Sequence, residues 1–61
     1  MTRIIDGVTY KPKTHKEGNQ YYPIVWFSCK AMTENFFLNT PQTTRRKART
    51  IAIKHINNIG K

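Results

Sequence analysis

The stretch YYPIVWFSCKA, residues 21–31, decides the fold, because it is the densest run of β-branched and aromatic side chains in a chain of 61 residues. Pro23 lies near its entry, where a missing backbone N–H is tolerated. In a strand, alternate side chains share a face. We expect the wholly apolar set to be buried, namely Val25, Phe27, Cys29 and Ala31. The opposite, mixed aromatic and polar set is Tyr22, Ile24, Trp26, Ser28 and Lys30.

The residues on either side of this strand predict hairpins. Asp6-Gly7, a dipeptide typical of tight turns, separates the apolar pieces 4–5 and 8–10. Residues 32–35 indicate a turn, and residues 36–39 a short strand that returns antiparallel to residues 21–31. Residues 11–20 contain a proline, a glycine and an asparagine, which predicts a loop. This loop is basic because it holds Lys11, Lys13 and Lys16.

The last third of the chain predicts one helix over residues 40–60. Thr40-Pro41 suits a helix start, and Gly60 suits a helix end. At 100° per residue, one stripe is apolar apart from a histidine: Ala48, Ile51, Ala52, His55, Ile56 and Ile59. We therefore expect a single α+β domain over residues 1–61. In it, a two- to three-stranded antiparallel sheet of short hairpins (residues 1–39) packs on one C-terminal amphipathic helix.

The charge of the chain points to a polyanionic partner. Eleven Lys and Arg residues against three Asp and Glu give a net charge of +8 and a pI near 10.2. Part of this charge is concentrated in the predicted helix, at Arg45, Arg46, Lys47, Arg49 and Lys54. Like charges at this spacing repel, and cations at a helix start oppose the helix dipole. We interpret them as phosphate contacts, and the alternative is an ordinary solvated helix face.

The mixed strand face is the second candidate surface. One helix can cover only one face of a sheet, so Tyr22 and Trp26 would remain open to bases or sugars. The alternative interpretation buries Trp26 beneath residues 11–20 or in a dimer interface.

Other classes of function find little support in the sequence. His15, Cys29 and His55 are too few and too scattered for a zinc site, so we expect neither metal nor cofactor. The three acidic residues have no partner at paired-carboxylate spacing, and an inward-facing Cys29 would be an inert thiol, so we expect no enzyme. An unpaired cysteine and the absence of a long apolar run favour a cytoplasmic protein without a membrane span.

The layout resembles the three-stranded-sheet-plus-helix domains at the N-terminus of tyrosine-type phage and transposon integrases. The resemblance rests on Tyr21-Tyr22 and Trp26, on Phe36-Phe37-Leu38, and on the basic run 45–48 that leads into Ile51-Ala52-Ile53. Those domains bind arm-type DNA sites with the sheet in the major groove. The resemblance implies base-facing roles for Tyr22, Ile24, Trp26, Ser28 and Lys30. Since 61 residues leave no room for the catalytic domain, it implies a stand-alone accessory or regulatory protein of a phage or mobile element.

Residues 44–52 also resemble the final helix of double-stranded RNA-binding domains, which leaves RNA open as a ligand. Our first hypothesis is a small non-enzymatic nucleic-acid-binding protein, with double-stranded DNA favoured over RNA. The alternative is a small phage-type interaction module that docks an acidic host protein through the aromatic face and the basic helix. In either case the chain is expected to be a monomer or a homodimer.

Overall fold

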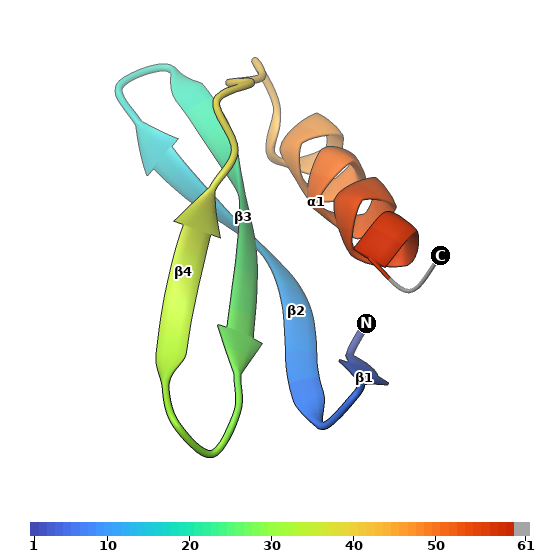
Figure 1. Cartoon of the computed structure of the whole chain (residues 1–61). Helices are drawn as coiled ribbons and strands as arrows, with labels where there is room; N and C mark the ends of the chain where they lie inside the picture. Colours follow the sequence, from blue (N-terminus) through green and yellow to red (C-terminus); the bar gives the residue numbers. More distant parts are fainter. Residues whose placement is uncertain (60–61) are drawn as a thin grey trace.

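A computed structural model describes residues 1–59 as four strands followed by one helix. The elements are β1 (Arg3–Ile5), β2 (Val8–Glu17), β3 (Gln20–Ser28), β4 (Thr33–Phe37) and α1 (Arg45–Ile59). The strands form one antiparallel sheet in the order β1-β2-β3-β4, so that each strand pairs with its neighbour in the chain (Figure 1). The predicted α+β class is confirmed, with a strand more than expected.

The first hairpin forms at the predicted turn. Asp6 and Gly7 both have positive φ, 51° and 79°, which is the backbone that a two-residue hairpin turn of matching twist requires. Ile5 pairs with Val8 directly across this turn.

The predicted basic loop over residues 11–20 is wrong, because most of it is the second half of β2. Lys11, Lys13 and Lys16 are strand residues, and the turn is confined to Gly18-Asn19. Exposed and half-buried positions alternate from Lys11 to Thr14, as expected for a strand with one covered face. The alternation of lysine with proline and threonine correctly indicated a strand, whereas the proline, glycine and asparagine content wrongly indicated a loop.

The second hairpin is shifted toward the N-terminus relative to the prediction. Strand β3 ends at Ser28, the turn occupies residues 29–32 with a Cys29 N–H to Met32 C=O bond of 2.9 Å, and β4 begins at Thr33. Cys29 is therefore half-buried in a turn and Ala31 is exposed, so neither extends the buried face as predicted. Lys30 also lies in this turn and not on the sheet.

Pro23 marks the place where β4 stops. The Leu38 N–H donates to the Pro23 carbonyl at 3.0 Å, but Pro23 has no N–H to return. The chain then leaves the sheet and rejoins β3 once, where Tyr21 and Gln42 exchange two backbone bonds of 2.8 Å.

This bridge keeps residues 40–42 extended, so the predicted helix start at Thr40-Pro41 is wrong. Thr44 is the N-cap, and its Oγ1 accepts a hydrogen bond from the Lys47 N–H at 3.2 Å. The predicted end at Gly60 lies outside the described residues.

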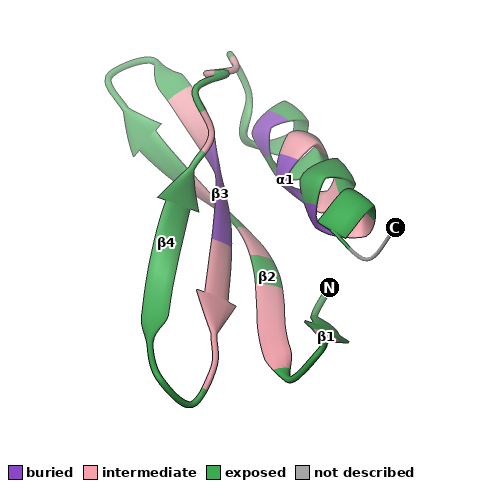
Figure 2. Ribbon diagram, viewed as in Figure 1, coloured by how far each residue is buried: buried purple, intermediate pink, exposed green. Residues whose placement is uncertain are grey.

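Helix α1 packs against β2 and β3 on one face of the sheet, which we call the inner face (Figure 1). Its contact stripe is Ala48, Ala52 and Ile56, all fully buried, and the two alanines let the helix lie close to the strands. Val25 from β3 is 2% exposed beneath it (Figure 2). The core is narrow, because His55 and Ile59 sit at the margin of this stripe and are exposed, contrary to the prediction.

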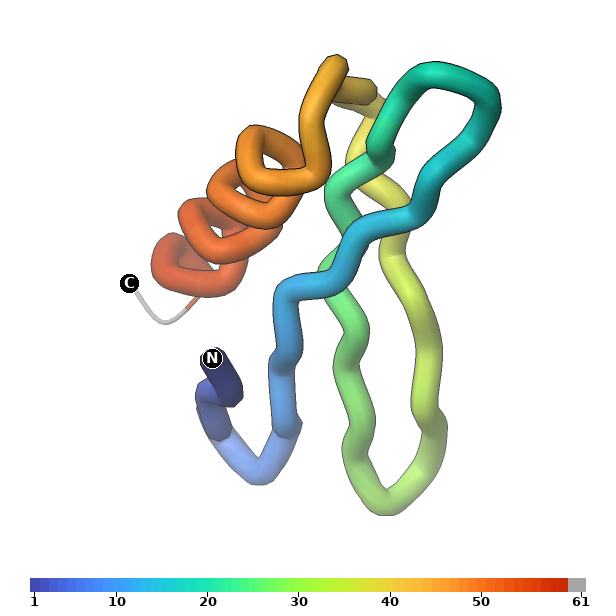
Figure 3. Tube along the Cα trace, turned by 180° about the vertical axis from the view of Figure 1, so that it is seen from behind, coloured from blue at the N-terminus to red at the C-terminus, as the bar shows by residue number. Residues whose placement is uncertain are grey.

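The two ends of the described chain are tied together. The Arg3 guanidinium donates to the Asn57 side-chain carbonyl at 3.0 Å, which joins β1 to the last turns of α1. Figure 3 shows these two segments near each other. This hydrogen bond links the first strand of the sheet to the C-terminal half of α1.

Candidate nucleic-acid interface

The face of the sheet that lies away from α1, here called the outer face, collects side chains from three strands. Register and alternation place on it Lys11, Lys13 and His15 of β2, Tyr22, Ile24, Trp26 and Ser28 of β3, and Asn35 and Phe37 of β4. No helix of the described chain covers this face (Figure 1).

Trp26 is the centre of the outer face. It is half-buried, and it pairs with Lys11 on β2 and with Asn35 on β4. The ammonium groups of Lys11 and Lys13 lie 5.1 and 5.4 Å from the centre of its ring, within cation–π range. Lys11 and Lys13, which were predicted to lie in a basic loop, therefore contact Trp26 from the neighbouring strand. They place two positive charges beside its indole ring.

Ile24 does not serve as a base-facing residue, because it is only 6% exposed. Phe37 of β4 pairs with Ile24, and His15 of β2 pairs with the adjacent Tyr22. The rings of Phe37 and His15 meet edge to face, 5.7 Å apart, and so bridge from one flanking strand to the other across β3. This aromatic bridge buries Ile24 within a second, small hydrophobic cluster.

The remaining predicted members of the strand face behave differently from one another. Ser28 lies on the outer face and shares a 2.8 Å hydrogen bond with the Thr33 hydroxyl, while Tyr22 is half-buried. Lys30 is exposed in the β3–β4 turn and lies beyond the paired part of the sheet, so its predicted place beside Trp26 is wrong. Asn35 takes that place, and it was missed because residues 32–35 were predicted to form a turn.

The five predicted phosphate-binding side chains of α1 are all exposed: Arg45, Arg46, Lys47, Arg49 and Lys54. Among residues 1–59 the single contact of a basic nitrogen with a carboxylate within 4.0 Å joins His15 to Glu17, at 3.9 Å, and involves none of these five. The first turn of α1 contains no acidic residue that would balance them. Their charge is therefore directed to the solvent.

Arg45 is held more firmly than its neighbours. Its guanidinium lies 5.6 Å from the centre of the Tyr21 ring, and the Lys16 ammonium lies 5.9 Å from the same ring. Tyr21 and Lys16 are paired residues near the β2–β3 turn. The basic start of α1 and the end of the β2–β3 hairpin thus form one cationic corner.

The outer face and the helix cations lie on opposite sides of the sheet, since α1 covers the inner face (Figure 1). The sequence predicted both surfaces but not this separation. A flat ligand laid on the outer face would not reach Arg46 or Arg49, whereas a ligand that rises past the hairpin end of the sheet would meet the cationic corner first.

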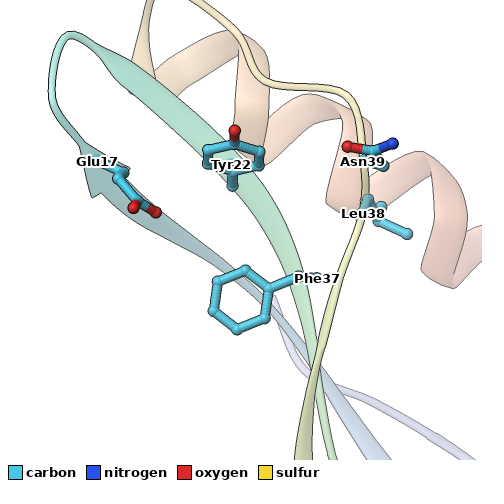
Figure 4. Close-up of a pocket in the computed structure, with 5 residues that line it drawn as sticks. All are labelled: Glu17, Tyr22, Phe37, Leu38 and Asn39. Atoms are coloured by element: carbon cyan, nitrogen blue, oxygen red, sulfur yellow. The ribbon is translucent and has the colours of Figure 1, made fainter.

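A shallow cavity of about 160 Å³ opens at the hairpin end of the outer face (Figure 4). The residues that line it are Glu17, Tyr22, Phe37, Leu38 and Asn39. Two aromatic rings, one carboxylate and one amide give it the polar and stacking groups that a planar or cationic group needs. Nothing in the sequence pattern signalled this cavity, because β4 and the segment after it close it from a distance in the chain.

The described residues contain no group of three His, Cys, Asp or Glu side chains that could hold a metal ion. His15 lies on the outer face, His55 beside Phe36 at a ring distance of 6.2 Å, and Cys29 in the β3–β4 turn. No helix in the described range is long and apolar enough to cross a membrane.

Comparison with protein-family models, with curated proteins and with solved structures finds no match. The resemblance to integrase arm-binding domains therefore stays a prediction.

Proposed function

We propose that this chain is a small non-enzymatic nucleic-acid-binding protein that prefers double-stranded DNA. The observation that carries the proposal is the outer face, on which two lysines of β2 lie beside a half-buried tryptophan that no helix covers. A net charge of +8 supplies the long-range attraction to phosphates.

The dimensions of the sheet favour a duplex. The backbones of β2 and β4 lie two strand spacings apart, which is about 10 Å, and the major groove is about 12 Å wide. Lysine, serine and asparagine side chains on this face carry the donors and acceptors that read base edges. The groove walls rise about 8.5 Å beside an inserted element, so phosphates that pass the hairpin end would reach Arg45 and the cations behind it.

The proposed division of labour follows from this placement. Lys11, Lys13 and Trp26 contact bases and sugars, while Arg45, Arg46, Lys47, Arg49 and Lys54 contact phosphates, with Lys16 between the two sets. A role as an accessory or regulatory protein of a phage or mobile element rests on the integrase resemblance alone. The free thiol of Cys29 is compatible with a reducing, cytoplasmic setting.

Fluorescence titration tests the proposal directly, because Trp26 is the one tryptophan of the chain and lies in the proposed contact. Duplex DNA, single-stranded DNA and duplex RNA are each added at several salt concentrations. With five to eight phosphate contacts, the slope of log affinity against log salt on duplex DNA should be roughly −4 to −7. A flat slope, or binding that leaves Trp26 emission unchanged, would contradict the proposed interface.

The alternative, docking of an acidic protein, uses the same cations and aromatic side chains. It predicts capture of one stoichiometric acidic partner that survives nuclease treatment. Loss of every captured species on nuclease treatment would favour the nucleic-acid function.

A further inference from the structure

The two edges of the sheet differ in how they are protected. Natural edge strands are kept from pairing with other chains by shortness, by lysine or proline, or by a covering element. β1 is three residues long and carries Arg3, whose side chain reaches across to α1. β4, with the sequence TENFF, is five residues long and contains no Lys, Arg or Pro.

β4 is also uncovered on both faces. All five of its residues are exposed (Figure 2). Phe36 and Phe37 are each 51% exposed, and as neighbours in a strand they point to opposite faces. Helix α1 packs over β2 and β3 and meets β4 through the Phe36–His55 contact. β4 thus combines two half-exposed aromatic rings with an edge that carries one charged residue, Glu34, and no lysine, proline or covering helix.

The backbone groups available at this edge can be assigned. The Leu38 N–H bonds to β3, and bonding direction alternates along a strand, so Phe36 and Glu34 also bond to β3. The N–H and C=O groups of Thr33, Asn35 and Phe37 therefore point away from the sheet. Three residues in register present a ready ladder for an added strand.

We propose that β4 is a dimerisation edge, on which β4 of a second copy of this chain pairs antiparallel to make a continuous eight-stranded sheet. With Phe36 opposite the same residue of the second copy, Asn35 of each strand bonds to Phe37 of the other. This register satisfies the outward backbone groups of Asn35 and Phe37, sets the two Phe36 rings opposite each other on the inner face, and brings the two Phe37 rings to diagonal positions on the outer face.

Charge distribution argues for a second copy as the occupant. Two chains of charge +8 repel, and β4 is the edge strand without a cation, so it is where two copies approach at least electrostatic cost. An antiparallel pair of identical strands also closes on itself with two-fold symmetry and leaves no further edge of the same kind. The inference concerns the protein free of nucleic acid, because an eight-stranded sheet is wider than the groove into which β2 to β4 are proposed to fit.

Sedimentation velocity on nucleic-acid-free protein tests the inference, from about 5 μM to about 500 μM at low and at high salt. The small interface predicts a Kd on the order of 10 μM. Salt screens the repulsion between the copies, so dimerisation should tighten as salt rises, opposite to the salt dependence of nucleic-acid binding. A chain that stays monomeric over the whole range, or that dissociates as salt rises, would overturn the inference.

The variant Asn35→Pro removes one outward N–H without touching a bond to β3, and proline is tolerated on a free edge. It should raise the Kd at least about tenfold, whereas the control Asn35→Thr, which keeps the N–H, should dimerise like the parent chain. Circular dichroism checks that both variants fold. If Asn35→Pro does not fold, Phe36→Lys adds a cation to the strand and must weaken the dimer in its place. Dimerisation unchanged in the folded variant would mean that another surface is responsible.

Discussion

The outer face of the sheet and the solvent side of α1 both present cations, but they hold them in different ways. Lys11 and Lys13 lie over the Trp26 ring, so each makes a contact of about 0.5–1 kcal/mol that stabilises the fold. Arg46 and Arg49 have no acidic partner within the described residues and lie close to other cations. Each such helix pair costs a few tenths of a kcal/mol.

The two sets of cations therefore contribute to the free energy of folding with opposite signs. The contact with Trp26 explains the positions of Lys11 and Lys13, because it stabilises the folded chain. Cations that destabilise the helix they lie on bring the fold no gain, which agrees with the proposed contact with phosphates outside the chain. For the proposed phosphate contacts, α1 is therefore the stronger candidate of the two surfaces.

The largest expected effect tests whether the two surfaces belong to one cooperative unit. Ile56→Ala empties a fully buried site between α1 and the sheet and should cost about 2–5 kcal/mol. A domain of this length is stable by only roughly 3–9 kcal/mol, so the variant should be largely unfolded or close to it. Helix ellipticity and Trp26 fluorescence, followed together in urea, should report one shifted transition.

Ile59→Ala is the matched control, because Ile59 lies on the same helix but is 37% exposed. Its cost should stay below about 1 kcal/mol. If the helix signal is lost in Ile56→Ala while the Trp26 transition stays in place, the two surfaces fold independently and the comparison between them loses its basis.

A second prediction separates the roles of the two surfaces in binding. Trp26→Ala should weaken binding by about 1–3 kcal/mol through lost stacking and should reduce discrimination between duplex, single strand and RNA. Arg46→Ala should leave discrimination intact and lower the magnitude of the salt slope by about 0.9. Anisotropy of labelled nucleic acid measures both variants without relying on Trp26.

Lys30→Ala provides the control for charge, since Lys30 is exposed in the β3–β4 turn away from both surfaces. It removes the same formal charge as Arg46→Ala but should leave the slope within error of the parent. If Trp26→Ala and Arg46→Ala had the same effect on the salt slope and on the discrimination between nucleic acids, base and phosphate contacts would not be divided between the two surfaces.

The sequence was sufficient where a signal was local. Asp6-Gly7 specified its turn through backbone conformation, and alternation placed Val25 on the face of β3 that α1 covers, although Phe27 on the same face is half-buried. The α1 stripe was also local, since Ala48, Ala52 and Ile56 follow helical spacing. These features together define an antiparallel sheet with one helix on one face.

The sequence was insufficient where strand register decides the outcome. Ile24 has the same alternation as Trp26, yet it is buried because Phe37 and His15 meet across it. That contact exists only once β2 and β4 are aligned on β3. The helix start was misplaced for a similar reason, since the bridge between Tyr21 and Gln42 holds residues that would otherwise suit a cap.

The smallest expected effect tests whether a cation at the start of α1 lowers stability while it strengthens binding. Thr44 is the N-cap and Lys47 occupies the third helical position, whose N–H the Thr44 hydroxyl receives. Lys47→Glu would complete a capping box and place a negative charge at the positive end of the helix dipole, so it should stabilise the fold by about 0.3–1 kcal/mol. The same change should weaken binding to duplex DNA and reduce its salt slope by about one.

Lys47→Gln separates charge from capping, because glutamine can also complete the box but carries no charge. Thermal unfolding should rank the chains Glu above Gln above Lys at position 47, while affinity for DNA should rank them in the reverse order. A protein selected for stability alone would have no reason to keep lysine at a position where both substitutes fold better. If Lys47→Glu binds DNA as tightly as the parent chain, the basic helix start has no share in the contact, and the outer face alone must carry it.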